Sequence, residues 1–208
     1  MKRAAIGVRM HSGWGVLVAV SGDADSVEVI DRRRIVVTDP KTPGGNQPYH
    51  HAASLEFPEA EKYLANSAAL SERLALATVK EVVKELGERN CRVVGCAVIL
   101  ASGRVLPSLE KILAAHPLIH TAEGEFFRNA VRKACEGLKI SVSAIRERDL
   151  DQQAKSTFGS AAIRVQRKIA GMGKLVGPPW TKDHKAAATA ALLMLAHKSG
   201  SRRAAAGV

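Results

Sequence analysis

The chain has 208 residues, of which 46% are hydrophobic, so it can bury one substantial core but is too short for two domains of ordinary size. Its three cysteines have no paired Cys-x-x-Cys spacing and indicate neither a disulfide framework nor a zinc site. No apolar run reaches the roughly 18 residues that span a bilayer, so we expect a soluble, cytoplasmic protein with no membrane partner.

The charge balance is strongly basic. Lysine and arginine number 31 against 20 aspartate and glutamate, which gives a net charge of +11. Such a charge favours polyanionic partners through its field and through counterion release. It is also compatible with a merely solvated surface, because several of these charges fall at helical spacing.

The start of the chain has the pattern of strands. Residues 4 to 9, 14 to 21 and 27 to 38 alternate or run apolar and are rich in valine and isoleucine. Turn residues at 21 to 25 precede the third segment, so we predict a three-stranded antiparallel meander. The segment 38 to 54 is dense in proline and glycine and predicts an irregular connection of unusual length.

A helix and a buried strand follow the meander. Pro58, with acidic residues just after it, is a typical helix start, and an apolar stripe continues to Leu86 and Gly87. We expect this helix to break near Asn66. Residues 93 to 100 form a continuous apolar run, which is typical of a strand that helices cover on both faces.

The remaining chain predicts helices and one more strand. Thr121 can cap a helix whose first turn holds Glu123 and Glu125. The further predicted features are the end of that helix at Gly137, a strand at residues 140 to 145, and helices at about 150 to 170 and 181 to 198. We expect one domain over residues 1–198 and a disordered basic tail over residues 199–208.

Two motifs carry a resemblance to a known family. The first is Ile-Gly-Val-x-x-x-Ser-Gly-Trp-Gly-Val from Ile6 to Val16, and the second is Asp-His-Lys-Ala-Ala-Ala-Thr-Ala-Ala-Leu from Asp183 to Leu192. With the order of the predicted elements, they resemble the RuvC-type resolvase branch of the ribonuclease H-like superfamily. The resemblance implies an α/β fold with a five-stranded mixed sheet in the order 3-2-1-4-5 and helices on both faces.

The resemblance also implies an activity, which this sequence does not fully support. Enzymes of the family cleave phosphodiesters with two divalent ions, such as Mg²⁺ or Mn²⁺, held by acids on the first strand, the fourth strand and the last helix. Here the first-strand position is Arg9, residues 93 to 100 contain no acid, and only Asp183 matches. Because Arg9 places a permanent positive charge where a metal ion would sit, we expect an Arg9–Asp183 ion pair in place of the metal.

A different metal site is the alternative. Candidate catalytic residues are Asp183, Glu123 and Glu125, and candidate metal ligands are Asp183, Glu123, His120 and His184, with His50 and His51 in the long loop. No pair among them has a recognised spacing such as His-x-x-x-His on one helix. The acids also suit a helix N-terminus, and loop histidines are commonly solvated, so a metal is not required to explain them.

The basic residues are candidate contacts to phosphate. Arg164, Arg167 and Lys168 fall on one side of a predicted helix, at spacings of three and four residues. The full set of candidate nucleic-acid contacts is Arg9, His11, Trp14, Arg164, Arg167, Lys168, Lys174, Lys182 and Lys185. Trp180, in the Gly-rich loop before the last helix, can either stack on a base or pack under that helix.

These observations favour a ribonuclease H-like module that has lost its metal ligands and binds nucleic acid without cutting it. Aromatic residues make up only 4% of the chain, so the contacts should be mainly to phosphate and largely indifferent to base sequence. The alternative function is a divergent metal-dependent hydrolase or nuclease. A homo-oligomer is compatible with either.

Overall fold

The structure, a computed structural model, describes residues 1–101 and 105–205. One five-stranded sheet has the order β3-β2-β1-β4-β5. The strands are β1 (Lys2–Met10), β2 (Trp14–Ser21), β3 (Glu28–Val36), β4 (Cys91–Leu100) and β5 (Val142–Arg146). The helices are α1 (Pro48–Ala52), α2 (Phe57–Glu88), α3 (Leu109–Leu113), α4 (His116–Gly137), α5 (Leu150–Phe158), α6 (Ala162–Gly171), α7 (Gly173–Val176) and α8 (Lys182–Ala205), with 3-10 turns η1 (Glu147–Asp149) and η2 (Gly159–Ala161).

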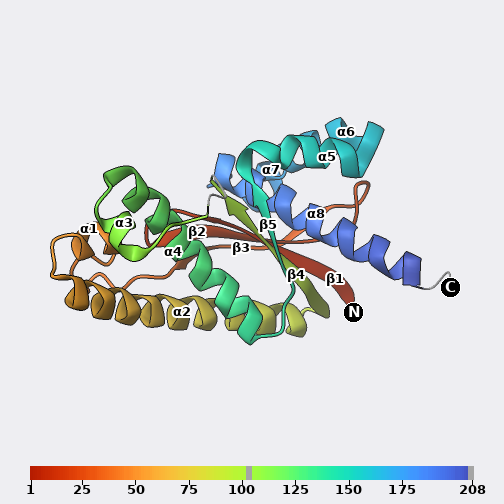
Figure 1. Cartoon of the computed structure of the whole chain (residues 1–208). Helices are drawn as coiled ribbons and strands as arrows, with labels where there is room; N and C mark the ends of the chain where they lie inside the picture. The colour runs from red at the N-terminus through yellow and green to blue at the C-terminus, as the bar shows by residue number, and fades with distance from the viewer. Residues whose placement is uncertain (102–104, 206–208) are drawn as a thin grey trace.

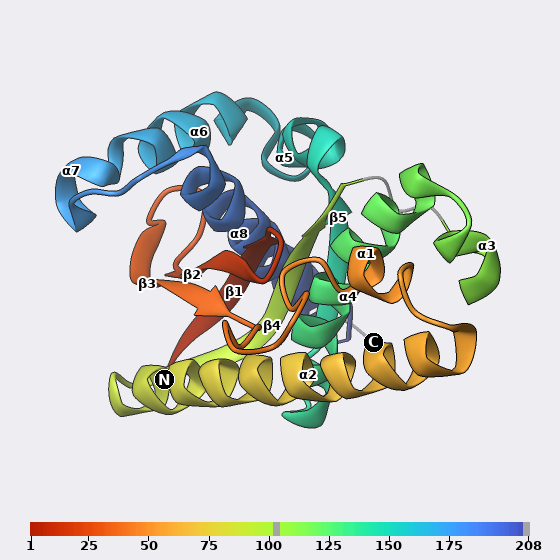
Figure 2. The same ribbon diagram turned by 90° about the vertical axis from the view of Figure 1, so that its left-hand side faces the viewer.

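The sheet confirms the predicted strand order. β1 lies in its middle, antiparallel to β2 and parallel to β4, and β2 and β3 complete the antiparallel meander. β5 extends the sheet in parallel with β4. α2 and α4 cover one face and α5, α6 and α8 the other (Figures 1 and 2).

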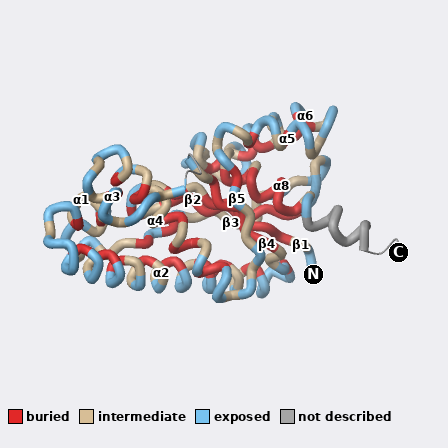
Figure 3. Tube along the Cα trace, in the orientation of Figure 1, coloured by how far each residue is buried: buried red, intermediate tan, exposed pale blue. Residues whose placement is uncertain are grey.

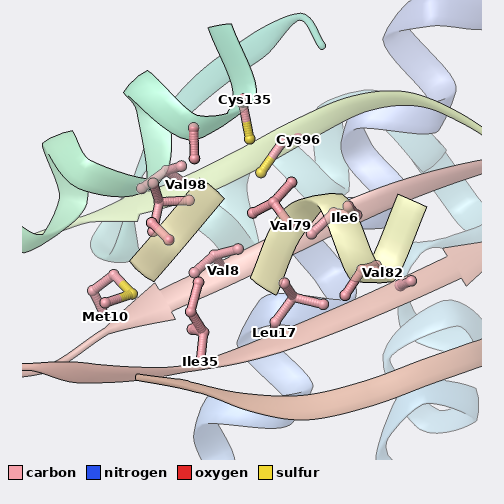
Figure 4. Close-up of a cluster of buried hydrophobic side chains, with 14 of the residues drawn as sticks. Ile6, Val8, Met10, Leu17, Ile35, Val79, Val82, Cys96, Val98 and Cys135 are labelled. Atoms are coloured by element: carbon pink, nitrogen blue, oxygen red, sulfur yellow. The ribbon is translucent and has the colours of Figure 1, made fainter. Parts of the chain in front are cut away.

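Alternation along β1 divides the core in two. Ile6 and Val8 point into a cluster under α2 and α4, whereas Ala5 belongs to the cluster under α8. Burial is therefore concentrated on the sheet and on the helix sides that face it (Figure 3). In the first cluster, the sulfur atoms of Cys96 and Cys135 face each other between β4 and α4 (Figure 4). Both thiols are buried.

α8 approaches β1 more closely than any side chain would permit. A Cβ atom added to Gly7 would lie 1.9 Å from the carbonyl oxygen of Ala187 and 3.0 Å from the amide nitrogen of Ala191. The small residues of the Asp183 to Leu192 motif thus let the helix lie on the strand backbone. This contact places the start of α8 beside the end of β1.

Several predicted boundaries are wrong. α2 is continuous through Asn66, and α1 lies within the segment expected to be irregular. α4 begins at His116, five residues before the predicted cap Thr121, so Glu123 and Glu125 are not in its first turn. The hydroxyl of Thr121 instead donates to the carbonyl of Pro117 within the helix, at 3.0 Å.

The end of the chain also differs from the expectation. The predicted helix at 150 to 170 is divided by η2 at Gly159, where φ is +53°. α8 continues past residue 198 to Ala205, and residues 206–208 of the expected tail lie outside the described residues. No helix in the described part of the chain is both long and apolar enough to cross a bilayer.

Replacement of Gly7 by alanine tests the close packing of α8 on β1. We expect Gly7→Ala to lower the free energy of unfolding by about 1–3 kcal/mol, because the new methyl group must displace the helix backbone. Gly87→Ala, in α2, is the matched control: its Cβ would meet no atom within 4 Å. The control should be unchanged or more stable by about 0.5–1 kcal/mol. Urea denaturation measures both, and equal stability of the two variants would contradict the close contact.

Candidate functional site

The end of β1 carries a partly buried ionic network centred on Arg9. Its Nη2 donates to Oε2 of Glu147 at 2.8 Å, and its Nε lies 3.1 Å from Oδ1 of Asp183. The Arg9 side chain is only 20% exposed. Nε is buried and does not point at an acceptor despite this short distance, so the contact with Asp183 is ionic rather than a linear hydrogen bond. The predicted Arg9–Asp183 pair is confirmed, and Glu147 is an additional partner.

Further basic and aromatic groups surround this network. Nε2 of His11 lies 2.9 Å from the second carboxylate oxygen of Asp183, and the His11 ring stacks on Trp14 with centroids 4.5 Å apart. The guanidinium of Arg34 lies 4.2 Å from the centroid of Trp14. A cation in this position is attracted by the electron-rich face of the ring. Three of these groups, His11, Trp14 and Arg34, therefore form one contiguous surface next to Asp183.

The network is unsuited to the two divalent ions that the family resemblance implies. Two-metal chemistry needs several carboxylates that converge on the ions. Here both carboxylates, Glu147 and Asp183, already share the guanidinium of Arg9, and Lys182 adds a second cation 3.5 Å from Glu147. β4 contributes no acid. The residues present do not fit a two-metal centre.

The first turn of α8 holds Asp183 in place. His184, three residues after Thr181, brings its Nδ1 to 2.8 Å from the Thr181 hydroxyl and accepts from the Thr181 amide at 3.3 Å. It thus takes the role that glutamate or glutamine has in a capping box. Burial, and then the positive charge of Arg32, lower the pKa of His184 below its ordinary value. His184 is therefore a capping residue of α8.

A hollow of about 520 Å³ lies between β3 and the start of α8, lined by Trp14, Val16, Arg32, Arg33, Arg34, Pro179, Thr181, Asp183 and His184. Two of its arginines have structural partners. Arg32 donates to the carbonyls of Val176 and Pro178, and Arg33 pairs with Glu85 at 2.5 Å. Arg34 has no carboxylate partner in the described part of the chain, so its charge is available at the rim.

Two residues of the predicted basic face on α6 make contacts within the protein. Nη2 of Arg164 lies 2.5 Å from Oδ1 of Asp25, in the turn between β2 and β3, and Lys168 donates to the Asp25 carbonyl. Arg167 and Lys174 are exposed, and neither makes a hydrogen bond or ion pair within the described residues. Lys185 is half-buried on α8.

Trp180 packs within the protein. Its indole nitrogen donates to the carbonyl of Ile169 at 2.8 Å, and its ring lies against the core cluster under α8. Of the two alternatives for Trp180, packing under the last helix is therefore the one that the structure shows.

The candidate metal residues fall into two separate groups. Oε1 of Glu123 lies 2.8 Å from Nδ1 of His50, whereas Asp183 contacts Arg9 and His11. Within the described residues, three or more potential ligands come together only at His50, His116 and His120. Glu125 pairs with Arg128 at 3.1 Å, and His51 packs on Tyr63. The structure thus does not unite Asp183 with Glu123, Glu125 and the histidines.

Two residues that the structure places at these sites were not among the residues predicted from the sequence. Glu147 directly follows β5, and an acid immediately after a strand that neighbours the site was an available signal. His116 lies four residues before His120, a spacing that places both on one side of a helix. This spacing from His120 is the signal that could have identified it.

Comparison with known proteins places the fold. No protein-family model matches the sequence, and no curated protein matches it. Two solved structures from Thermus thermophilus are similar over almost the whole chain. RuvC superposes with a TM-score of 0.52 at 14% identity, covering 94% of this chain and 94% of that one. RuvC in complex with a Holliday junction substrate superposes with a TM-score of 0.53 at 13% identity, covering 95% and 96%. At these identities the likeness concerns the fold.

Substitution of Arg9 tests whether this residue is what makes the site unsuitable for metal. Mg²⁺ binds mainly to oxygen ligands, and the two carboxylates here are already paired with Arg9. Excess Mg²⁺ should therefore leave the melting temperature of the unmodified protein unchanged. In Arg9→Asp, a third carboxylate joins Glu147 and Asp183, and Mg²⁺ should raise the melting temperature. Arg9→Ala, which removes the cation without adding a ligand, should respond less. Stabilisation of the unmodified protein by Mg²⁺ that disappears in Asp183→Asn would contradict this interpretation.

The lowered pKa of His184 predicts a pH dependence. The unfolded chain, with an ordinary value of 6.5, binds this proton more readily than the folded chain. The free energy of unfolding should therefore be highest above pH 6.5 and fall as the pH drops through the folded-state pKa. His184→Gln keeps a capping group but cannot titrate, so its stability should fall less between pH 7.5 and pH 5. Urea denaturation at several pH values measures the difference, and parallel curves would refute the assignment.

Proposed function

Because the chain has the ribonuclease H-like fold in the arrangement of RuvC, we propose that it binds nucleic acid through phosphate contacts and does not cut it. The observation that carries this proposal is the position of Arg9. A guanidinium lies where the family resemblance places a metal-binding acid, and it is held there by Glu147 and Asp183. The arrangement retains a basic surface but lacks a centre for two-metal hydrolysis.

The surface around this network supports the binding part of the proposal. Arg34 is exposed at the rim of the hollow, with the ring of Trp14 beside it. Lys182 is exposed next to Glu147 of the Arg9 network. Arginine and lysine at this density attract a phosphate backbone, and each phosphate contact releases counterions. The net charge of +11 adds a favourable long-range field. One RuvC structure contains a Holliday junction, so a four-way DNA junction belongs among the nucleic acids to be tested.

The alternative is a divergent metal-dependent hydrolase that uses Asp183 with Glu123, Glu125 and histidines. It is less well supported, because those acids have separate partners: Asp183 pairs with Arg9, Glu123 with His50, and Glu125 with Arg128. A reaction that needed all three would require these contacts to break. We therefore favour binding without cleavage.

Fluorescence anisotropy with a labelled four-way junction, duplex and single strand, at several salt concentrations, tests the proposal. We expect affinity to fall steeply with salt. Arg34→Ala with Lys182→Ala should weaken binding to all three and reduce the slope of log K against log salt by about 2, one for each lost phosphate contact. The matched control is Lys80→Ala with Lys84→Ala on α2, which removes the same charge from two other exposed sites. It should retain nearly full affinity.

Two results would contradict this proposal. Salt-insensitive binding, or no binding at low salt, would remove the phosphate-contact mechanism. Cleavage of any of the three substrates in Mg²⁺ or Mn²⁺ that is lost in Asp183→Asn would instead support the hydrolase.

A further inference from the structure

α1, α3 and the start of α4 lie together at one end of the molecule (Figure 1). Three histidines from two separate segments converge there. His50 comes from α1, and His116 and His120 lie one turn apart on α4. Their rings meet edge to face at interplanar angles of 64° to 86°, with centroids 4.5 to 5.2 Å apart. One potential ligand nitrogen from each residue lies within 4.8 Å of the other two.

One pair of these histidines already has the nitrogen–nitrogen separation of a metal site. Nε2 of His50 lies 3.3 Å from Nε2 of His116. Two nitrogens bound to one tetrahedral zinc ion at the usual bond length of about 2.0–2.1 Å are ~3.3 Å apart. His116 and His120 are both exposed, so rotation of their side chains can bring the third nitrogen to a similar distance without moving the core.

The buried carboxylate of Glu123 orients His50. Its Oε1 lies 2.8 Å from Nδ1 of His50 and also accepts from the His50 amide at 3.2 Å. When Nδ1–H donates a hydrogen bond to this carboxylate, the lone pair is on Nε2, the atom that lies 3.3 Å from His116. Metal-bound histidines in proteins commonly have this arrangement, in which a carboxylate accepts from one ring nitrogen while the other ring nitrogen binds the metal.

The charge balance also favours a cation. The Glu123 side chain is only 6% exposed, and among the described residues it pairs with no lysine or arginine. Burial, and the negative charge of Glu123, raise the pKa of Tyr49 beside it. A divalent ion held by the neighbouring imidazoles would stabilise this buried carboxylate, which pairs with no lysine or arginine among the described residues.

We propose that His50, His116 and His120 form a site for one divalent transition-metal ion, with Glu123 as the positioning residue. Imidazole nitrogens select zinc, cobalt, nickel or copper over magnesium. Three protein ligands leave at least one coordination position for water or an external ligand. The site is separate from the Arg9 network and does not depend on nucleic-acid binding.

Isothermal titration of the untagged, chelator-treated full chain with Zn²⁺ tests the site, and Co²⁺ provides a second readout. We expect one Zn²⁺ per chain, no response to Mg²⁺, and visible absorption bands of a nitrogen-ligated Co²⁺ ion. His116→Ala with His120→Ala should abolish both signals, and because these side chains are exposed the variant should remain folded by circular dichroism. Glu123→Gln should weaken Zn²⁺ binding about 10–100-fold while one ion still binds. His197→Ala, an exposed histidine on α8, is the control and should bind normally.

The outcomes separate this site from the proposed function. The absence of Zn²⁺ binding by the unmodified chain, or binding that survives the double substitution, would overturn the metal site and leave the DNA measurements unaffected. Normal Zn²⁺ binding by a chain that does not bind DNA would support the metal site while refuting the proposed function.

Discussion

The interaction on which the site depends is the sharing of one guanidinium by two carboxylates from different parts of the chain. Arg9 ends the central strand, Glu147 begins η1 after β5, and Asp183 lies in the first turn of α8. All three side chains are one-third exposed or less, so their attraction is screened less than that of a surface pair. The removal of one member would leave a half-buried charge without its partner. The same interaction that joins these three elements engages both carboxylates with Arg9.

Much of the fold could be predicted because the pattern of apolar residues in each strand indicates which of its faces are buried. β4 is apolar on both sides and is covered on both sides, whereas β1 alternates between two cores. The predicted strand order follows once a central strand is flanked by a meander and a parallel neighbour. The Arg9–Asp183 pair could also be predicted, because two short motifs at opposite ends of the sequence resemble segments that meet in one known fold.

The errors arose where one local signal competed with another. Thr121 has a side chain that can cap a helix. Pro117 is an equally good signal for a helix start, and α4 begins one residue before it, at His116. Asn66 and Ser67 are weak helix formers, yet Ser67 is buried in an uninterrupted α2, so packing outweighs propensity. Glu147 was missed for another reason: its place directly after β5 is a weak local signal, and its partner Arg9 is 138 residues away in the sequence.

The absence of a side chain at Gly7 fixes the distance on which the ionic network relies. Gly7 is two residues before Arg9 on β1, and Ala187 is four residues after Asp183 on α8, which runs in the opposite direction. Two strand residues advance about 6.6 Å and four helical residues about 6 Å, so the two lengths nearly match. The backbone contact between Gly7 and Ala187 thus places Arg9 and Asp183 side by side. Their proximity is a steric property of the scaffold, and it would persist even if the charged groups themselves were exchanged.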